Sequence, residues 1–311
     1  MFLQIAALIL GLAMVIGGAN ALVDGASSVA RRTGVSEFVI GLVIVGFGTS
    51  LPELVVSVTG ALARNLDIAV GNVIGSNIFN TALILAVSAM FAPMAITRQN
   101  KFRDIPLTIL VSFLVAFFGY YGGLSRAEGI IMVVLFAIYI IWSFRSDDTA
   151  QEQTPEDAKE FGTFASIVLI AGGLACLVFG GRLFVESAEN VARMLGVSDK
   201  FIAITVLAMG TSLPELVTSI VALAKKRSQM ALGNILGSNV FNLLLILGVS
   251  AVISPTSFAR IDLWDYATLL LSIILVWTGI YTGRKNLLDR FDASLLLLLF
   301  AAYMTKLFIN L

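Results

Sequence analysis

Long apolar stretches alternate with short polar segments along most of the chain. Each stretch is about as long as the 20 residues that a helix needs to cross the hydrocarbon core of a bilayer. Ten are expected in all, near residues 2–30, 36–62, 68–90, 105–122, 127–144, 163–192, 198–223, 230–253, 264–282 and 291–309. The pattern predicts an all-α integral membrane protein with ten transmembrane helices.

A polar, acidic segment separates these stretches into two sets of five. It runs from Arg145 to Gly162 and reads RSDDTAQEQTPEDAKEFG. A regulatory cation site is one interpretation, but the segment lacks the alternating ligands and the glycine of an EF-hand loop, so a solvated connector is favoured. The expected domains are a first five-helix repeat over 1–145, an acidic cytoplasmic linker over 146–162 and a second five-helix repeat over 163–311.

Two sequence motifs occur twice, 162 residues apart. GTSLPELVVS begins at Gly48 and GTSLPELVTS at Gly210, while GNVIGSNIFN begins at Gly71 and GNILGSNVFN at Gly233. The two halves are therefore predicted to be duplicates. Because five is an odd number of helices, the second half must enter the membrane from the opposite side, which gives the inverted-topology repeats of many transporters.

The distribution of Lys and Arg predicts the orientation, because cytoplasmic loops carry an excess of positive charge. With the N-terminus outside, the inner loops hold thirteen Lys and Arg residues and the outer segments six, with Arg182 inside a helix. The inner residues include Arg98, Lys101, Arg103 and Arg227. Both termini are therefore expected to be extracellular and the linker cytoplasmic.

Composition narrows the possible chemistry. The chain is 58% hydrophobic and 13% charged, with a net charge of zero, so nothing indicates a nucleic-acid partner. It has no histidine and one cysteine, which removes the usual ligands of zinc, copper and iron and the commonest general base. We expect Cys176 to be a small buried hydrophobe. An enzyme and a resident cofactor are both disfavoured, and any metal ion must bind through oxygen.

Two glutamates lie inside the apolar stretches. A carboxylate at mid-membrane costs roughly 3 kcal/mol on insertion scales, so Glu53 and Glu215 need a function. Thr49 and Ser50 lie four and three residues before Glu53, so both hydroxyls share its helix face. Thr211 and Ser212 stand in the same way before Glu215, and the spacing predicts two matching clusters of oxygen ligands.

Each of these motifs also interrupts its own helix. Pro52 and Pro214 remove a backbone donor and so free a carbonyl that can bind a cation. Gly46 and Gly48 make local unwinding easier. Because irregular backbone at membrane depth lines cavities or transport sites, we expect broken helices at mid-membrane.

The second motif adds neutral oxygen atoms. Ser76 and Asn80 are four residues apart, and Ser238 and Asn242 repeat them in the other half. Close helix packing is the role expected for four glycines: Gly71, Gly75, Gly233 and Gly237. Two carboxylates with hydroxyl and amide oxygens indicate Ca²⁺ or several Na⁺, whereas Mg²⁺ ranks lower because it needs near-ideal octahedral geometry.

The paired GTSLPE and GSNxFN stretches resemble the two alpha repeats of the cation/Ca²⁺ exchanger superfamily, in its Na⁺/Ca²⁺ exchanger branch. The resemblance covers essentially the whole chain and implies alternating access by sliding of the first and sixth helices. It also implies exchange of three Na⁺ for one Ca²⁺. By position, Glu53 and Glu215 would be the main Ca²⁺ ligands. The other ligands would be Thr49, Ser50, Thr211, Ser212, Ser76, Ser238 and the carbonyls of Gly46 and Ala208, with Asn80 and Asn242 in the central positions.

The resemblance further implies K⁺ independence, because K⁺-dependent relatives have an aspartate at the position of Asn242. The short linker indicates a prokaryotic plasma-membrane protein, expected to act as a monomer with the bilayer, Ca²⁺ and Na⁺ as its partners. An H⁺/Ca²⁺ antiporter stays open, although that branch lacks the full first motif. A cation channel with a ring of carboxylates also stays open, while the duplicated halves favour alternating access.

Three acidic residues lie near the ends of the first and sixth helices. Asp24, Glu186 and Glu189 are candidates for ion gates, although an interfacial position is the simpler interpretation. Arg182 is spaced four residues before Glu186, which favours an ion pair between them.

Overall fold

The structure is a computed structural model, and it describes residues 1–64, 66–147, 160–196, 210–255, 258, 261–282, 284 and 286–309, without the side chain of Leu66. Almost all of these residues are helical. The α-helices and the π-helices (η) are α1 Phe2–Thr33, α2 Glu37–Ile40, η1 Gly41–Gly46, α3 Phe47–Thr49, α4 Leu51–Leu62, α5 Leu66–Ile78, η2 Phe79–Ile84, α6 Leu85–Phe91, η3 Asn100–Asp104, α7 Ile105–Tyr120, α8 Arg126–Arg145, α9 Thr163–Met194, α12 Leu213–Ala224, α13 Ser228–Val240, η6 Phe241–Ile246, α14 Leu247–Ile253, α15 Leu263–Gly279 and α16 Arg290–Ile309. Two short strands, β1 Met94–Ala95 and β2 Leu287–Leu288, pair antiparallel.

Seven helices in the described part are long and apolar enough to cross a membrane, and the bent pair Glu37–Thr49 and Leu51–Leu62 makes an eighth. Two shorter apolar helices, α12 and α15, have similar composition. The chain is therefore an all-helical membrane protein, as the hydrophobic pattern predicts. Nearly half of the expected stretch at 198–223 lies outside the described residues, so ten spans stay a prediction.

The helix bounds of the two halves match over the motif region. α12, α13, η6 and α14 begin and end 162 positions after α4, α5, η2 and α6. The wide π turns η2 and η6 contain Asn80 and Asn242, the last asparagine of the second motif in each half. Such turns occur often at functional sites. The sequence repeat is thus also a repeat of local structure.

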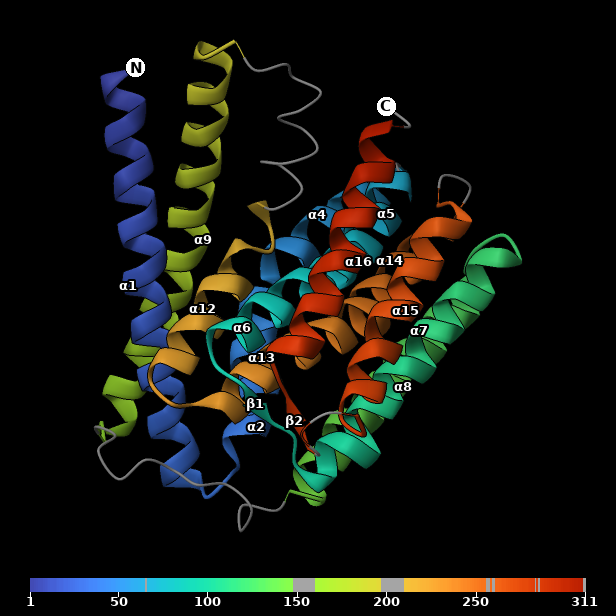
Figure 1. The fold of residues 1–311 in the computed structure, drawn as a ribbon, viewed down its shortest axis with the longest axis horizontal. Helices are drawn as coiled ribbons and strands as arrows, with labels where there is room; N and C mark the ends of the chain where they lie inside the picture. Colours follow the sequence, from blue (N-terminus) through green and yellow to red (C-terminus); the bar gives the residue numbers. More distant parts are fainter. Residues whose placement is uncertain are drawn as a thin grey trace.

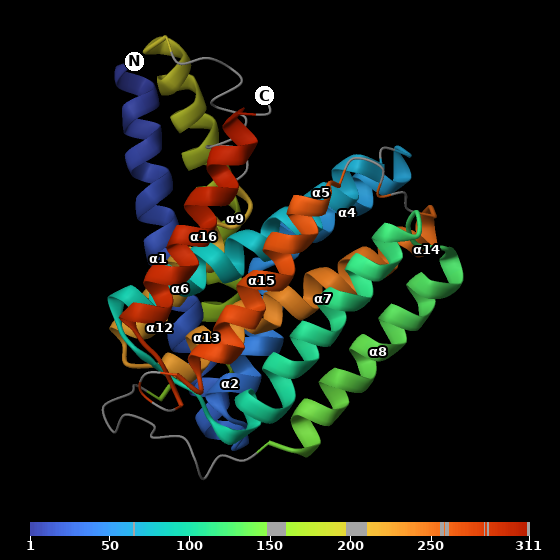
Figure 2. The same cartoon turned by 45° about the vertical axis from the view of Figure 1, so that its right-hand side comes forward.

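α1 and α9 stand side by side along much of their length (Figure 1, Figure 2). A Cβ added to Gly11 would lie 2.9 Å from the carbonyl oxygen of Gly180, and one added to Gly18 would lie 2.7 Å from that of Gly173. The α9 numbers fall as the α1 numbers rise, so the two helices are antiparallel. Cys176 also faces Gly18, but it is partly exposed rather than buried, so that expectation was wrong.

The first and last helices place both ends of the chain at the same end of the molecule. α1 begins and α16 ends at the same end, while α2, β1 and β2 lie at the opposite end (Figure 1, Figure 2). A chain that starts and finishes on one side of a membrane crosses it an even number of times. The common side of the termini therefore agrees with an even number of spans.

α13, η6 and α14 form the centre of the bundle. In the Ser228–Ile253 stretch 83% of the most apolar window is buried, against 22% for α1. A Cβ on Gly233 would lie 2.2 Å from the carbonyl oxygen of Phe38, and one on Gly237 would lie 2.8 Å from Cα of Leu42. The predicted packing role of these two glycines is therefore confirmed.

Gly71 and Gly75 differ from these two equivalents. A Cβ at either position has no neighbour within 4 Å among the described residues. The segment that the repeat would place against them, residues 200–204, lies outside the described part of the chain. Their predicted packing role stays a prediction.

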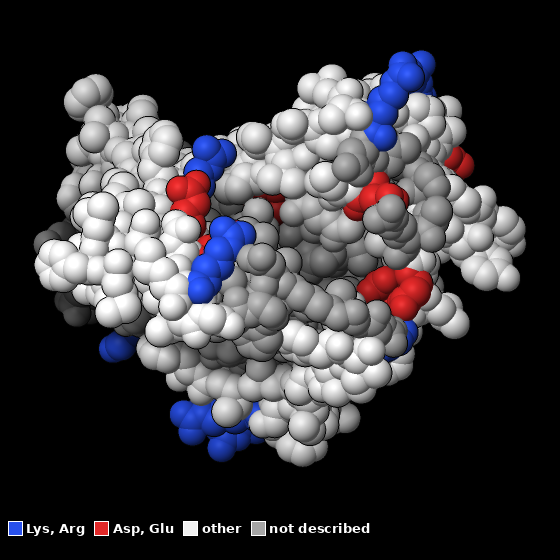
Figure 3. Space-filling view, turned by 90° about the horizontal axis from the view of Figure 1, so that it is seen from above, with Lys and Arg blue, Asp and Glu red and all other residues white. Residues whose placement is uncertain are grey.

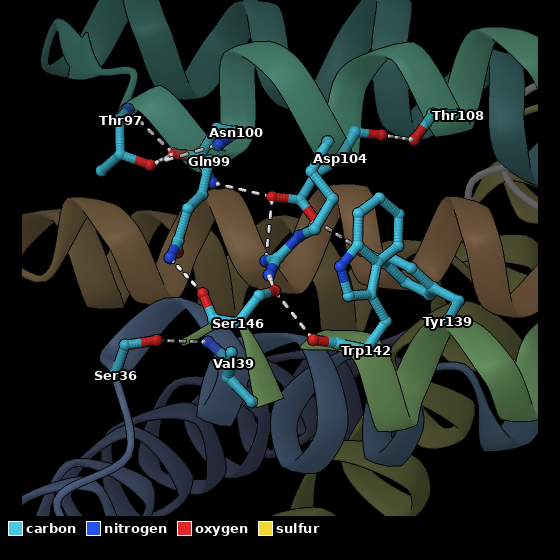
Figure 4. A network of polar contacts seen from close by, with 11 residues as sticks. Ser36, Val39, Thr97, Gln99, Asn100, Asp104, Thr108, Tyr139, Trp142 and Ser146 are labelled. Carbon is cyan, nitrogen blue, oxygen red and sulfur yellow. Dashed lines mark hydrogen bonds and ion pairs between the residues drawn. The ribbon is translucent and has the colours of Figure 1, made fainter. Parts of the chain in front are cut away.

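A buried polar network joins η3, just before α7, to α8 (Figure 4). Asp104 is fully buried, and its carboxylate binds Nε of Arg103 at 2.8 Å and accepts a hydrogen bond from the Tyr139 hydroxyl at 3.0 Å. Arg103 thus neutralises the Asp104 carboxylate, because an unpaired charge buried in the protein would be strongly destabilising. Arg227 does the same for Glu37. Both arginines were expected in cytoplasmic loops. Arg227 lies in the connection between α12 and α13, whereas Arg103 lies within η3, so for Arg103 the expectation was wrong.

Candidate functional site

The first motif contains a break in its helix. The helices on either side of Ser50 meet at an angle of 50°. Ser50 has φ −84° and ψ 5°, which is outside the α-helical region, and Pro52 stands in the first turn of α4. The predicted broken helix is therefore present here. Glu53 lies in the first turn of the new helix, where the positive end of the helix dipole stabilises a carboxylate.

The second copy of the motif repeats this geometry where it is described. Ser212 has φ −89° and ψ 2°, and it precedes α12 as Ser50 precedes α4. Pro214 and Glu215 stand in the first turn of α12. The residues before this break, including Ala208, lie outside the described part of the chain.

The carbonyl oxygen of Gly46 lies where polar groups of both halves meet. It accepts hydrogen bonds from the backbone N–H of Ser50 at 3.1 Å and from the hydroxyls of Thr49 and Ser238, each at 3.4 Å. A Cβ at Gly46 would lie 3.1 Å from the carbonyl oxygen of Asn234. The glycine therefore allows η1 to approach α13 closely.

Side chains of each half contact the other half. Ser50 Oγ donates to Oε1 of Glu215 at 3.2 Å, and Thr49 Oγ1 donates to Oδ1 of Asn234 at 3.2 Å. In the other direction, the hydroxyl of Thr211 lies beside the carboxylate of Glu53, together with the Ser76 hydroxyl of the same half as Glu53. The negative charges of Glu53 and Glu215 are also close enough to repel one another. The two motifs thus form one cluster.

Two asparagines that sequence reasoning missed support the helices of the two glutamates. Nδ2 of Asn72 donates to the carbonyl oxygen of Glu53 at 3.1 Å and to the Ser57 hydroxyl at 2.9 Å. Asn234 makes the equivalent contacts in the second half, at 3.3 and 2.9 Å. Both asparagines follow the first glycine of the second motif, so their recurrence in both halves was the available signal.

Most of the predicted ligands are buried in this cluster. Exposed fractions of 5% or less are found for Thr49, Ser50, Glu53, Ser76, Asn80, Ser212, Glu215, Ser238 and Asn242. Gly46 is buried as well, and Thr211 is half-buried.

Several buried oxygen atoms of the cluster have no hydrogen-bond partner in the described part of the chain. They are Oε2 of Glu53, Oε2 of Glu215, Oδ1 of Asn80, Oδ1 of Asn242 and Oγ of Ser212. A buried polar atom without a partner is unfavourable, and each one needs an explanation. A cation bound among these atoms would supply it.

The donor set fits a hard cation. Among the described residues, no group of three or more His, Cys, Asp and Glu side chains can hold a metal ion, so two carboxylates must act with neutral oxygens. Ca²⁺ takes six to eight oxygen ligands in flexible geometry, including carboxylates, amides and carbonyls. Two carboxylates also match the charge of one divalent ion.

A cavity of about 250 Å³ leads along α9 to the motif residues. Its walls include Glu186 and Glu189 of α9 together with Pro52, Thr211 and Pro214. The face at the end of the termini is hollowed near its centre, with acidic side chains beside the hollow (Figure 3). Arg182 also lines the cavity and Glu189 is paired with Arg193, so positive charge partly balances these carboxylates.

The charged residues at the ends of α1 and α9 are partly paired. Asp24 binds Nζ of Lys225 at 2.7 Å and so links α1 to the end of α12. The predicted pair of Arg182 with Glu186 is absent from the ion pairs of the described residues, and both side chains are exposed. The i to i+4 ion pair of α9 lies further along, between Glu189 and Arg193.

The sequence profile of the family described as "Sodium/calcium exchanger protein" matches residues 3–145 and 165–309. The chain belongs to the sodium/calcium exchanger family. This exchanger is 34% identical to "Inner membrane protein YrbG" of Escherichia coli (strain K12) over 88% of each chain. It is 30% identical to "Sodium/calcium exchanger MaX1" of Methanosarcina acetivorans over 97% of each chain.

A solved structure shares the fold of this exchanger. It is that of the sodium-calcium exchanger NCX_Mj soaked with 10 mM Na⁺ and zero Ca²⁺, with a TM-score of 0.86 and 30% identity. The match covers 98% of this chain and 99% of the other. The exchanger is therefore a multi-pass membrane protein of a transporter family, with prokaryotic relatives, and its activity is cation/Ca²⁺ antiport.

Proposed function

We propose that this chain exchanges Na⁺ for Ca²⁺ across a prokaryotic plasma membrane, by alternating access to the buried oxygens of the two GTSLPE motifs. The observation that carries the proposal is that Ser50 of the first half binds Glu215 of the second, beside carboxylate oxygens that have no partner among the described residues. One Ca²⁺ would neutralise both glutamates. Na⁺ ions would compete for the same negative charge, and this competition would couple the two fluxes.

The proposed ligands are those that the sequence predicts. Glu53 and Glu215 bind Ca²⁺ and share Na⁺, and the remaining oxygens come from Thr49, Ser50, Ser76, Asn80, Thr211, Ser212, Ser238, Asn242, Gly46 and Ala208. Burial of nine of these residues supports the proposal. A neutral amide at Asn242 leaves two central carboxylates, which favours three Na⁺ per Ca²⁺ without K⁺.

The proposed architecture is ten helices in two inverted repeats, 1–145 and 163–311, joined by the cytoplasmic linker 146–162. Opposite directions of α1 and α9 and the matching helix bounds of the two halves support it. Both termini would be extracellular, and one monomer holds both motifs. Inverted halves around one site can exchange outward and inward access.

Ca²⁺ uptake into proteoliposomes tests the proposed coupling. The full chain is reconstituted, loaded with Na⁺ and diluted into medium without Na⁺ or K⁺, with an ionophore that removes any pH gradient. Uptake is expected only with the outward Na⁺ gradient, and adding K⁺ should not change it. Uptake that followed a pH gradient and ignored Na⁺ would establish H⁺/Ca²⁺ antiport instead. Flow of Ca²⁺ down its own gradient without a counter-ion would establish a channel.

A further inference from the structure

A second cavity, of about 740 Å³, lies at the end of the molecule that carries α2, β1 and β2, opposite the termini (Figure 1). Its walls come from the start of α2, the start of α13, the turn between β1 and η3, and the residue before β2. It shares no residue with the candidate cation site. Helices α2 and α13 nevertheless continue from this cavity toward that site.

Positive charge dominates the walls of this cavity. Arg98, Lys101 and Lys226 line it, and Glu37 is the only acidic residue among its lining residues in the described part. Glu37 is already bound by Arg227. Neither Arg98 nor Lys226 has an acidic partner among the described residues, and both are exposed. The cavity therefore carries an excess of positive charge that would attract an anion.

A buried amide also faces the cavity without a full set of partners. Gln229 lines the cavity and is 8% exposed. Its Nε2 donates to the carbonyl oxygen of Ala95 at 2.6 Å, while its buried Oε1 has no partner in the described part of the chain. That oxygen is an acceptor, so it needs a donor such as a hydroxyl group. An anion that carries a hydroxyl would satisfy both the cations and this amide.

Aromatic side chains place the cavity at the level of lipid head groups. The ammonium of Lys101 lies 3.9 Å from the ring centre of Tyr281, and the Tyr281 ring packs edge-to-face against Trp277, with ring centres 5.4 Å apart. Phe102, which lines the cavity, is 65% exposed. Exposed Trp and Tyr gather where a protein crosses the membrane–water interface. The cavity is therefore within reach of a lipid head group.

The internal repeat provides a comparison within the same chain. The residue 162 positions after Lys101 is Leu263, and the residue 162 positions before Gln229 is Asp67. The equivalent location in the other half thus loses one cation and gains an acidic residue. The basic cavity is a property of one face and not a consequence of the duplication.

We propose that this cavity binds the phosphate of an anionic lipid, with a phosphoglycerol head group as the preferred class. Arg98, Lys101 and Lys226 bind the phosphate oxygens, and a glycerol hydroxyl donates to Oε1 of Gln229. Basic pockets between helices on one side of a membrane recognise anionic head groups in this way. The proposal does not depend on which cations the protein exchanges.

Native mass spectrometry of the purified full chain tests the site, with short-chain phosphatidylglycerol as the probe. The double variant Arg98→Gln with Lys226→Gln should bind it about 25-fold more weakly, about fivefold for each charge removed. The matched control is Arg64→Gln with Arg126→Gln. Arg64 is the repeat equivalent of Lys226, and both residues have positive φ, 56° and 60°. The control should keep the affinity of the unmodified chain, and equal losses in the two double variants would overturn the proposal.

Two further measurements define the ligand and guard against a folding defect. Gln229→Glu should weaken phosphatidylglycerol binding at least about tenfold by repulsion, and it should also lower the unfolding temperature, because a carboxylate cannot donate to the carbonyl oxygen of Ala95. The double variant Arg98→Gln with Lys226→Gln changes only exposed side chains, so its unfolding temperature should stay unchanged. Unaltered lipid binding in either variant would contradict the site. Free glycerol 1-phosphate should not displace the lipid at equal concentration. If it did, the cavity would recognise a soluble phosphate, and the lipid assignment would be wrong.

Discussion

Ser50 Oγ donates a hydrogen bond of 3.2 Å to Oε1 of Glu215, from the break in the first motif to the carboxylate of the second. The two residues are 165 positions apart. Neither motif is therefore complete alone, because the hydroxyl of one half orients the carboxylate of the other. This contact orders the cluster of predicted ligands and leaves the second oxygen of Glu215 free for a cation.

Replacing either central glutamate should abolish Ca²⁺ transport. Glu53→Gln and Glu215→Gln each keep the shape of the side chain but remove one of the two buried charges. Loss of one partner of a buried charge pair costs about 3 kcal/mol or more, so Ca²⁺ flux should fall at least about a hundredfold. Flux is measured in Na⁺-loaded proteoliposomes. The control is Glu160→Gln, in an exposed position, which should transport normally. If a variant of Glu53 or Glu215 also transported normally, that glutamate would not be a ligand of the site.

Removing the hydroxyl of Ser50 should weaken Ca²⁺ binding without unfolding the protein. A hydrogen bond to a charged group contributes about 1.5–3 kcal/mol, so Ser50→Ala should raise the dissociation constant of Ca²⁺ roughly tenfold to a hundredfold. Isothermal titration measures this change. The control is Ser88→Ala, since Ser88 is fully buried and its Oγ has no partner in the described part. Equal effects of the two variants would show that the Ser50–Glu215 contact has no part in binding.

Replacing Asn234 should lower stability and Ca²⁺ binding more than replacing Asn72, although the two are repeat equivalents. Each side chain holds the carbonyl of a glutamate and a serine, but Asn234 also accepts a hydrogen bond from Thr49 across the halves. Each unpaired buried group costs about 1–3 kcal/mol. Asn72→Ala should therefore lower thermal stability, and Asn234→Ala should lower it further and also weaken Ca²⁺ binding.

Thermal unfolding with and without Ca²⁺ separates these two effects, with Asn20→Ala as the control. The side-chain amide of Asn20 donates to the carbonyl oxygen of Ile16 in its own helix, and the backbone carbonyl that accepts from Lys225 is kept in the alanine variant. If Asn72→Ala weakened Ca²⁺ binding as strongly as Asn234→Ala did, the contact with Thr49 would not account for the difference.

The fold class and most of the buried ligands could be predicted from the sequence because both follow from local rules. The apolar stretches fix the spans, and the spacing of Thr49, Ser50 and Glu53 places three oxygens on one face. The repeat then indicates a second identical cluster. The spacing of these residues in the sequence was therefore enough to predict that their side chains are buried together.

The contacts between the halves could not be predicted, because they depend on how the helices cross. Spacing within one motif does not reveal that Ser50 reaches Glu215 or that Thr49 reaches Asn234. Arg103 was misplaced for a similar reason: hydropathy counts it as a loop cation, whereas tertiary packing brings it against the buried Asp104. Long-range pairing overrides local charge patterns where a buried carboxylate needs a partner.

Acid should inhibit transport by competing with the cations. A proton bound to Glu53 or Glu215 removes the negative charge that attracts Ca²⁺, so the rate should fall as the pH falls. Because the proton and Ca²⁺ occupy the same groups, a higher Ca²⁺ concentration should restore the rate. Initial uptake measured across pH at two Ca²⁺ concentrations, with the pH equal on both sides, checks this. A rate that stayed flat from neutral to clearly acidic pH would contradict the competition.

Two adjacent glycines of α1 should respond in opposite ways to the same substitution. A Cβ at Gly18 would lie 2.7 Å from the carbonyl oxygen of Gly173 and 2.8 Å from Cβ of Cys176, whereas one at Gly17 has no described atom within 4 Å. Gly18→Ala must therefore push α1 away from α9, and overpacking of this kind costs about 1–3 kcal/mol. Gly17→Ala should be neutral or stabilising by up to about 1 kcal/mol, since alanine favours the helix.

Thermal unfolding in detergent and Ca²⁺ uptake should both distinguish the two variants, with loss only in Gly18→Ala. The same contrast is expected on α9, where a Cβ at Gly173 would lie 2.7 Å from the carbonyl oxygen of Gly18 and one at Gly172 has open space among the described residues. Because helix propensity is the same for both members of each pair, a difference between them isolates the contact of α1 with α9. Equal stabilities for Gly17→Ala and Gly18→Ala would mean that the two helices do not pack at this distance in the membrane protein.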